Sequence, residues 1–129
     1  MKEIIRDGVC PFCIENFDKY HKEPKIKETQ YWILTKNDYP YEGAKIHLLL
    51  IHKKHLENLD KITPEASSDL MKLVSWSIKK FNIRGGSLFL RFGNMDYNGS
   101  SVAHLHAHLI SGKKRSNKTE SLKVKLAYK

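Results

Sequence analysis

The chain has 129 residues, of which 40% are hydrophobic and 10% aromatic, enough for one packed domain and too few for two. Its longest uninterrupted apolar run covers only residues 48–51, whereas a membrane span needs roughly 18. Charged residues stand at the N-terminus, where a signal peptide would need an apolar segment. We therefore expect a soluble, cytoplasmic protein with no membrane partner.

The positive charge is concentrated at the C-terminus. Lysine and arginine total 23 and aspartate and glutamate 14, which gives a net charge of +9. Residues 113–129 hold seven basic residues against Glu120 alone, so this segment carries +6 and the rest of the chain +3. We divide the chain into a domain over 1–112 and a basic tail over 113–129. Nucleic acid is a partner that we do not favour, because the body is nearly neutral and 113–120 has no aromatic residue to stack on bases.

The first half of the chain predicts one short helix and two strands. A Cys-Pro-Phe-Cys sequence at 10–13 precedes a predicted short helix over 14–19. β-branched and aromatic residues predict a strand over 29–35, in which Trp32 is assigned to the core. An apolar run predicts a central strand over 46–51.

The clearest helix follows. Thr63 is a suitable N-cap, and Pro64 is suited to the first helical position. Apolar residues then recur at helical spacing as far as Phe81, with Ile78 among them, and Gly85-Gly86 ends the helix.

The second half predicts further strands over 87–92 and 103–110, a mobile loop over 113–120 and an edge strand over 122–128. Together these elements predict an α+β fold, with an antiparallel sheet of about five strands and one long helix.

Three histidines alternate with apolar residues near the end of the domain. In a strand, side chains at i, i+2 and i+4 share one face, so His104, His106 and His108 line one surface while Leu105 and Ala107 pack behind them. A polar strand face without function is the alternative. Three histidines at strict period two, in a chain with only four others, make that coincidence improbable.

This segment resembles the His-φ-His-φ-His-φ-φ signature of the histidine-triad (HIT) family of nucleotide hydrolases and transferases, where φ is apolar. Residues 47–55 resemble the family's His-x-φ-φ-φ-Pro-Lys-x-His strand, with His52 in place of the proline. Gly99-x-Ser101-Val102 stands where the family has Gly-Gln-Ser-Val. The resemblance covers about residues 10–110 and implies a homodimer.

The resemblance also implies the chemistry. His106 would attack the α-phosphate of a nucleotide and form a covalent nucleotidyl-histidine, while its other ring nitrogen donates to a backbone carbonyl near His108. The implied catalytic residues are His106, His108 and His47. The implied substrate-binding residues are Asn94, Gly99, Ser101 and Asn37, with Asp38 as an alternative to Asn37 for the ribose.

The most favoured reaction is hydrolysis of nucleoside phosphoramidates or dinucleoside polyphosphates. A phosphorolytic nucleotidyltransferase, a DNA-end deadenylase and a non-catalytic nucleotide-binding module are the alternatives. Removal of the tail after Gly112 is expected to change hydrolysis of small nucleotides by no more than a few-fold.

The cysteines at 10 and 13 are either half of a metal site or a redox pair, and two reduced thiols are the third alternative. Zinc-containing branches of the family pair such cysteines with two histidines. The resemblance therefore implies a structural zinc held by Cys10, Cys13, His55 and His104, with His52 as a competitor of His55. His21 is assigned to an exposed loop.

Overall fold

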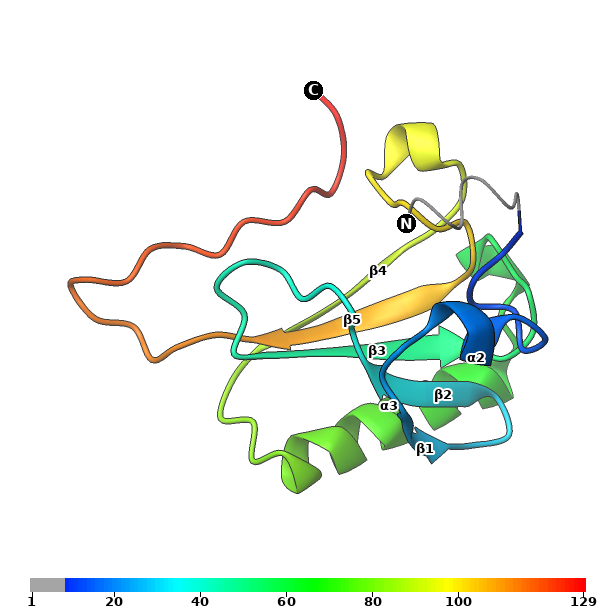
Figure 1. Ribbon diagram of the computed structural model, residues 1–129, viewed down its shortest axis with the longest axis horizontal. Helices are drawn as coiled ribbons and strands as arrows, with labels where there is room; N and C mark the ends of the chain where they lie inside the picture. Colours follow the sequence, from blue (N-terminus) through cyan, green and yellow to red (C-terminus); the bar gives the residue numbers. More distant parts are fainter. Residues whose placement is uncertain (1–8) are drawn as a thin grey trace.

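Five antiparallel strands form one sheet, and a long helix lies across one of its faces (Figure 1). The computed structural model describes residues 9–129. The elements in chain order are α2 (Phe17–Tyr20), β1 (Lys25–Glu28), β2 (Trp32–Lys36), β3 (Ile46–His52), the 3-10 turn η1 (Leu59–Lys61), α3 (Pro64–Lys80), β4 (Ser87–Arg91), the 3-10 turn η2 (Met95–Tyr97) and β5 (His106–Ser111). The strand order is β1-β2-β3-β5-β4, which confirms the predicted fold class.

Helix α3 begins where the sequence predicts. The Thr63 hydroxyl accepts a hydrogen bond from the Ala66 N–H at 3.1 Å, as expected of an N-cap. Leu70, Leu73 and Val74 are buried. Ile78, expected on the buried side, is exposed, because the small Ser77 occupies the buried position in the last turns.

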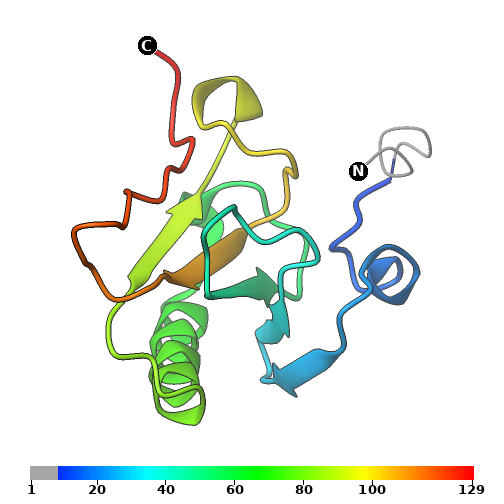
Figure 2. The ribbon, with the colours of Figure 1, turned by 60° about the vertical axis from the view of Figure 1, so that its left-hand side comes forward.

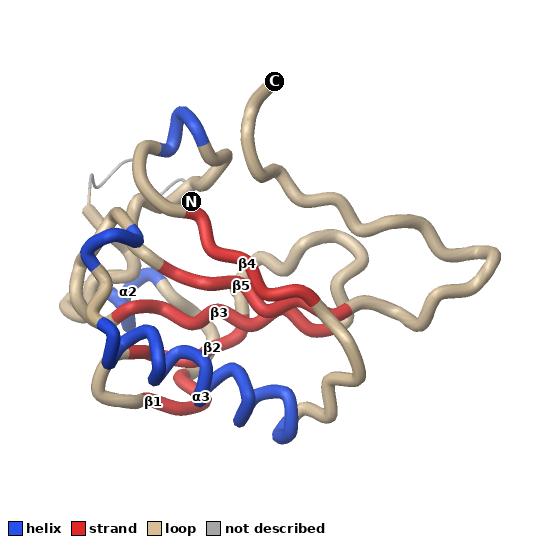
Figure 3. Tube along the Cα trace, turned by 180° about the vertical axis from the view of Figure 1, so that it is seen from behind, coloured by secondary structure: helices blue, strands red, loops and turns tan. Residues whose placement is uncertain are grey.

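The two faces of the sheet are both covered, which explains the nearly continuous apolar sequence of β3. One face packs on α3, as the view from behind shows (Figure 3), and includes Trp32, whose indole N–H donates to the Ala66 carbonyl at 2.8 Å. The prediction of Trp32 as a core residue is confirmed. On the other face, Ile33, Leu49 and Ile51 pack with Phe17 of α2.

Four local features differ from what the sequence predicts. The short helix begins at Phe17 instead of residue 14, the strand predicted over 103–110 begins at His106, and β1 was not predicted. Residues 122–128, predicted as an edge strand, are irregular and pair with no strand within the described residues. No helix within residues 9–129 is both long and apolar enough to cross a membrane.

The tail leaves the end of β5, runs outward and returns, so that its last residues lie beside the η2 turn (Figures 1 and 2). There the Arg91 guanidinium donates two hydrogen bonds to the Lys125 carbonyl. Gly99 has a φ of +72°, and a Cβ at this position would lie 2.7 Å from the Lys125 Cγ. The glycine therefore permits both the backbone turn and the close passage of the tail.

Candidate active site

Strands β3, β4 and β5 place a group of ring side chains on the sheet face opposite α3. His106 and His108 project from β5 on this face, because residues two apart in a strand share a face. The strand register sets Arg91 opposite His106 and Phe89 opposite His108. The Phe89 and His108 rings stack with centroids 4.6 Å apart.

The hydrogen bonds of His47 fix its tautomer and that of His108. The His47 Nδ1 accepts from the Tyr41 backbone N–H at 3.1 Å, so the proton of the neutral ring is on Nε2. His47 Nε2 lies 2.8 Å from His108 Nδ1 and donates to it. His108 therefore carries its own proton on Nε2, a buried atom without a hydrogen-bond partner among residues 9–129. This leaves a free donor on the His108 ring.

His106 has the opposite arrangement. Its Nδ1 lies 2.6 Å from the His104 carbonyl, which can only accept, so Nδ1 holds the proton and Nε2 keeps its lone pair. The carbonyl was expected near His108, and that prediction is wrong. The chain enters β5 just after His104, which brings the His104 carbonyl next to the ring two residues later.

Burial keeps these three imidazoles neutral. Burial, together with the charges of His104 and Arg91, lowers the pKa of His106 to about 4, against the opposing effect of the bond to the His104 carbonyl. Burial, Arg91 and His106 lower the pKa of His47 to about 4. Burial and the neighbouring His106 and His47 lower the pKa of His108 to about 2. At neutral pH, His106 Nε2 is thus an unprotonated nitrogen.

A cavity of about 230 Å³ opens beside these rings. The structure places four of the predicted site residues in its lining, namely Asn37, Ser101, His106 and His108. His47 contacts His108, and the Asn37 side-chain nitrogen lies 3.2 Å from His47 Nε2. The Asp38 carboxylate also reaches the cavity, but it accepts the backbone N–H groups of Lys22 and Glu23 at 2.9 Å each.

Asn94 and Gly99 do not line this cavity. The Asn94 side chain accepts the Asp96 backbone N–H at 2.8 Å and caps η2, so its amide oxygen serves the turn. Gly99 faces the tail at Lys125. The structure therefore does not bring these two residues together with the triad.

A second cluster lies next to the first, where Cys10 and Cys13 meet His55 and His104. Their ligand atoms all lie within 4.8 Å of one another. The His104 Nδ1 is 3.2 Å from the Cys10 Sγ and 3.7 Å from the Cys13 Sγ, and the His55 Nδ1 is 3.2 Å from the Cys13 Sγ. Ligands around a tetrahedral zinc, with bonds of about 2.0–2.3 Å, are separated by about 3.3–3.8 Å. The cluster has the size of a zinc site.

The protonation of the two imidazoles also fits a metal. His104 Nε2 donates to the His52 carbonyl at 2.6 Å, and His55 Nε2 donates to Glu57 at 3.0 Å. Both rings therefore direct an unprotonated Nδ1 at the cysteines, and these two nitrogens lie 3.2 Å apart with no proton between them. A cation between the two lone pairs removes their repulsion. Metal-binding histidines commonly have such a second partner.

The redox alternative for the cysteines has no support. The two cysteines are free thiols. Burial, with Cys10 and the charge of Glu15, raises the pKa of the Cys13 thiol to about 12. A reactive cysteine needs a lowered pKa.

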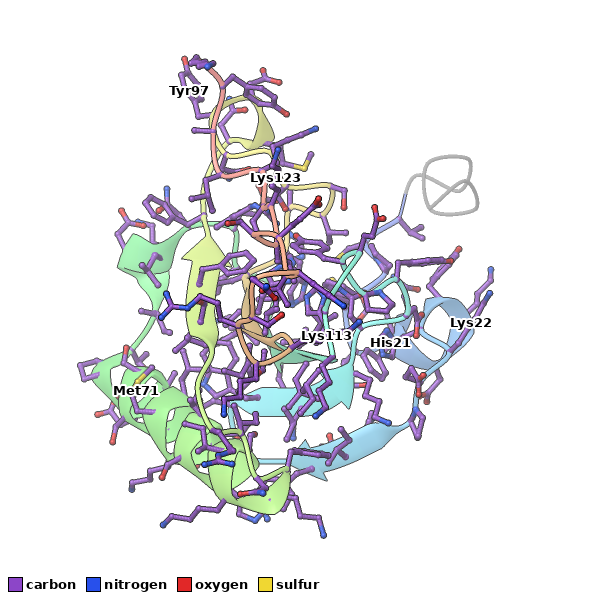
Figure 4. All side chains as sticks on the ribbon, turned by 90° about the vertical axis from the view of Figure 1, so that its left-hand side faces the viewer. His21, Lys22, Met71, Tyr97, Lys113 and Lys123 are labelled. Atoms are coloured by element: carbon purple, nitrogen blue, oxygen red, sulfur yellow. The ribbon has the colours of Figure 1, made fainter. Side chains whose placement is uncertain are left out.

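Two further predictions about histidines are wrong. His52 lies on the α3 side of the sheet against Trp32 and is not in the cysteine cluster. His21 is buried, with Nε2 2.8 Å from the Thr35 hydroxyl and Nδ1 3.4 Å from Asp38. In Figure 4, His21 lies on the inner side of α2 and Lys22 on its outer side.

Four residues of the site were not predicted. Phe12 lies between the cysteines and contacts the His106 ring edge-on at 5.0 Å. Tyr41 packs on His47 at 4.6 Å, while Phe89 and Arg91 face the triad from β4. The alternation of β4 shows that Phe89 and Arg91 share a face, but only the register shows that this face is the triad's.

Comparison with known proteins gives a consistent result. The sequence profile of the HIT domain matches residues 21–115. An uncharacterized HIT-like protein of Chlamydia trachomatis serovar D is 32% identical over 91 residues, which cover 68% of this chain and 79% of the relative. An uncharacterized HIT-like protein of Helicobacter pylori is 33% identical over 73 residues, which cover 55% of this chain and 68% of the relative.

Solved structures share the fold. A HIT family hydrolase from Clostridium thermocellum matches with a TM-score of 0.65 and 26% identity, over 84% of this chain and 95% of the other. A zinc-bound histidine triad family protein from Mycobacterium smegmatis matches with a TM-score of 0.64 over 92% of this chain and 83% of the other. At 18% identity the second likeness concerns the fold alone.

Proposed function

Because the chain belongs to the HIT family, we propose that it is a hydrolase acting at the α-phosphate of nucleotides, with His106 as the nucleophile. The observation that carries the proposal is the tautomer of His106. The bond from Nδ1–H to the His104 carbonyl leaves Nε2 with a lone pair, on a ring that lines the cavity. A neutral imidazole is an effective nucleophile toward phosphorus near neutral pH.

The reaction would proceed in two displacements. His106 Nε2 forms a bond to the α-phosphorus, and the bond from phosphorus to the leaving group breaks, with its electron pair going to the leaving group, which takes a proton from solvent where it leaves as an amine. Water then attacks the same phosphorus, the phosphorus–Nε2 bond breaks, and its electron pair returns to His106 while the water proton goes to solvent. The products are a mononucleotide and the free leaving group.

The unpaired His108 N–H has a role in both displacements. Negative charge increases on the phosphoryl oxygens as the phosphorus is attacked, and a fixed donor already in place stabilises that charge. His108 Nε2–H is such a donor, and the bond from His47 holds its tautomer. Ser101, which is exposed in the cavity lining, is a second candidate donor to the phosphate, and Asn37 is the candidate for the ribose.

Substitution of His106 by asparagine tests the proposal. His106→Asn is expected to abolish release of AMP from adenosine 5′-phosphoramidate and from diadenosine tetraphosphate, while AMP binding stays within a few-fold. Wild-type protein should also form an acid-labile adenylyl adduct that the variant lacks. His52→Asn, a buried histidine on the other side of the sheet, is the matched control. Turnover by His106→Asn near the wild-type rate would show that His106 is not the nucleophile.

We propose that Cys10, Cys13, His55 and His104 hold a structural zinc ion. The separations of the ligand atoms and the tautomers of both histidines support this assignment. When bound, zinc supplies a cross-link between the N-terminal segment and the start of β5. The same segment carries Phe12 to the His106 ring.

We also propose that the chain forms a homodimer through β4 and α3. In the described sheet, β4 has one unpaired edge, which another copy can extend with backbone hydrogen bonds. Leu88 on β4 and Met71 on α3 are 38% and 52% exposed. Burial of such apolar side chains in an interface would be favourable.

A further inference from the structure

Arg91 lies at the end of β4, beside the nucleophile. Its partner in the strand register is His106, so both side chains project from the same face of the sheet. Arg91 is half-buried and lines the same cavity as His106 and His108. No step of the proposed two displacements uses it.

The guanidinium is held in place from two sides. Its Nε–H and one Nη2–H donate to the single carbonyl of Lys125 in the tail. Its central carbon lies 5.3 Å from the centroid of the Phe89 ring, which stacks on His108. Figure 4 shows the course of the tail, from Lys113 past Lys123 toward the turn that carries Tyr97. The returning tail therefore fixes Arg91 next to the triad.

Arg91 still has donors and charge to offer. A guanidinium has five N–H donors, of which the Lys125 carbonyl accepts two. Within residues 9–129, Arg91 has no carboxylate partner. It is also the only lysine or arginine among the described residues that line the cavity. Arg91 therefore supplies the positive charge of this wall.

We propose that Arg91 binds a phosphate beyond the α-phosphate, so that the site prefers nucleoside di- and polyphosphates to substrates with an uncharged leaving group. The inference rests on the proposed function and adds the residue that selects the leaving group. Arginine suits this role because its planar fork makes paired, charge-assisted hydrogen bonds to phosphate oxygens. Lys125 acts through its carbonyl as a positioning residue for Arg91.

Equilibrium binding separates this inference from catalysis. α,β-Methylene-ADP adds a second phosphoryl group to AMP through a methylene bridge, which cannot be hydrolysed. Wild-type protein should bind α,β-methylene-ADP more tightly than AMP by calorimetry. Arg91→Gln should weaken the binding of α,β-methylene-ADP by about tenfold, the loss expected for a charged hydrogen bond. The same variant should weaken the binding of AMP by less than twofold. Arg91→Lys should recover part of the loss because it keeps the charge.

Kinetics provide a second measurement. Arg91→Gln should lower kcat/KM for diadenosine tetraphosphate by about tenfold more than it lowers kcat/KM for adenosine 5′-phosphoramidate. Arg84→Gln, an exposed arginine outside the cavity, is the matched control and should change neither value.

The outcomes distinguish the two proposals. An equal loss of affinity for AMP and for α,β-methylene-ADP in Arg91→Gln would overturn the inference, because Arg91 would then contact the α-phosphate or support the fold. An unchanged preference for the second phosphate in Arg91→Gln would overturn it as well. Normal binding preference without turnover of either substrate by wild-type protein would refute the hydrolase and support the role of Arg91 in binding.

Discussion

Each histidine of the two clusters has one ring nitrogen fixed by a neighbour and the other directed at its own site. His104 connects the clusters, because its ring directs Nδ1 at the cysteines while its backbone carbonyl orients the His106 ring. Phe12 makes a second connection from the cysteine segment to His106. A displacement of His104 would therefore change the geometry of both sites.

Glu57 gives the residue-scale test of the zinc proposal. Its carboxylate accepts from His55 Nε2 and so keeps the His55 Nδ1 unprotonated toward the cluster. Wild-type protein is expected to contain about one zinc per chain by elemental analysis. Glu57→Ala is expected to weaken zinc binding by about tenfold in competition with a chromophoric chelator, the lower end for such outer partners because this pair is exposed.

Two variants complete this experiment. Cys13→Ser removes a ligand and should lower the zinc content below one per chain. Glu120→Ala removes a carboxylate of the tail and should leave zinc affinity unchanged. Zinc affinity in Glu57→Ala equal to that of wild type would show that the Glu57 contact does not orient the ligand.

The sequence alone predicts the positions of some site residues better than those of others. The spacing of His104, His106 and His108 predicts one strand with a shared surface, because a strand has period two. His106 and His108 do lie on β5, but the strand begins only at His106, so His104 precedes it and its ring meets the cysteines. The contacts of Phe89 and Arg91 depend on the pairing of β4 with β5, and no local pattern encodes that register. The use of the Asn94 side chain as the N-cap of η2 also depends on the path of the chain after β4.

At the scale of elements, strong local signals were sufficient for α3 and β3. The capping residues and the apolar spacing of α3 agree, as do the length and hydrophobicity of β3. β1 is short and mostly charged, and it is a strand because the edge of β2 is available to it. Residues 122–128 alternate like a strand, but in the described part of the chain they pair with neither edge strand, β1 or β4, and alternation alone makes no ladder.

At the scale of elements, removal of the tail after Gly112 gives a testable prediction. A chain ending at Gly112 loses the Lys125 carbonyl that holds Arg91. It is expected to hydrolyse adenosine 5′-phosphoramidate within a few-fold of the full chain, as the sequence alone suggests. The sequence alone predicts the same small change for diadenosine tetraphosphate. The structure instead predicts a several-fold fall in its kcat/KM, because an Arg91 side chain released from Lys125 loses more conformational entropy when it binds phosphate.

A chain ending at Leu126 keeps Lys125 and serves as the control, with thermal unfolding as the check on folding of both shortened chains. Salt-sensitive binding to nucleic acid is expected to decrease only slightly in the shorter one. A large loss confined to nucleic-acid substrates would instead support the DNA-end alternative. Equal loss on both small substrates would assign the tail a general structural role.

At the scale of the whole molecule, one face of the sheet packs on α3 and the opposite face holds the site. β4 is an edge strand of this sheet. A second copy at this edge would lie beside Arg91, the last residue of β4. Assembly and substrate selection would then share one strand.

Leu88→Lys tests the homodimer. A charge on the exposed side of β4 opposes pairing of two copies, since like charges would meet across the new edge. Light scattering after size exclusion should give about 30 kDa for wild-type protein, twice the chain mass of 15.0 kDa, and the mass of one chain for the variant. Leu126→Lys, in the exposed tail, should remain dimeric. A monomeric wild-type protein would contradict the proposal.

The distance along the sequence between the two halves of the cysteine–histidine cluster has a consequence for how the molecule is made. Cys10 and His104 are 94 residues apart, so a ribosome synthesises nearly the whole domain between them. If the cluster binds zinc as proposed, the two cysteines cannot complete the site until the start of β5 has emerged from the ribosome. A metal captured at that moment closes a loop through most of the chain and removes conformational freedom from the unfolded state. Metal supply during synthesis would then influence how many new chains reach the native state.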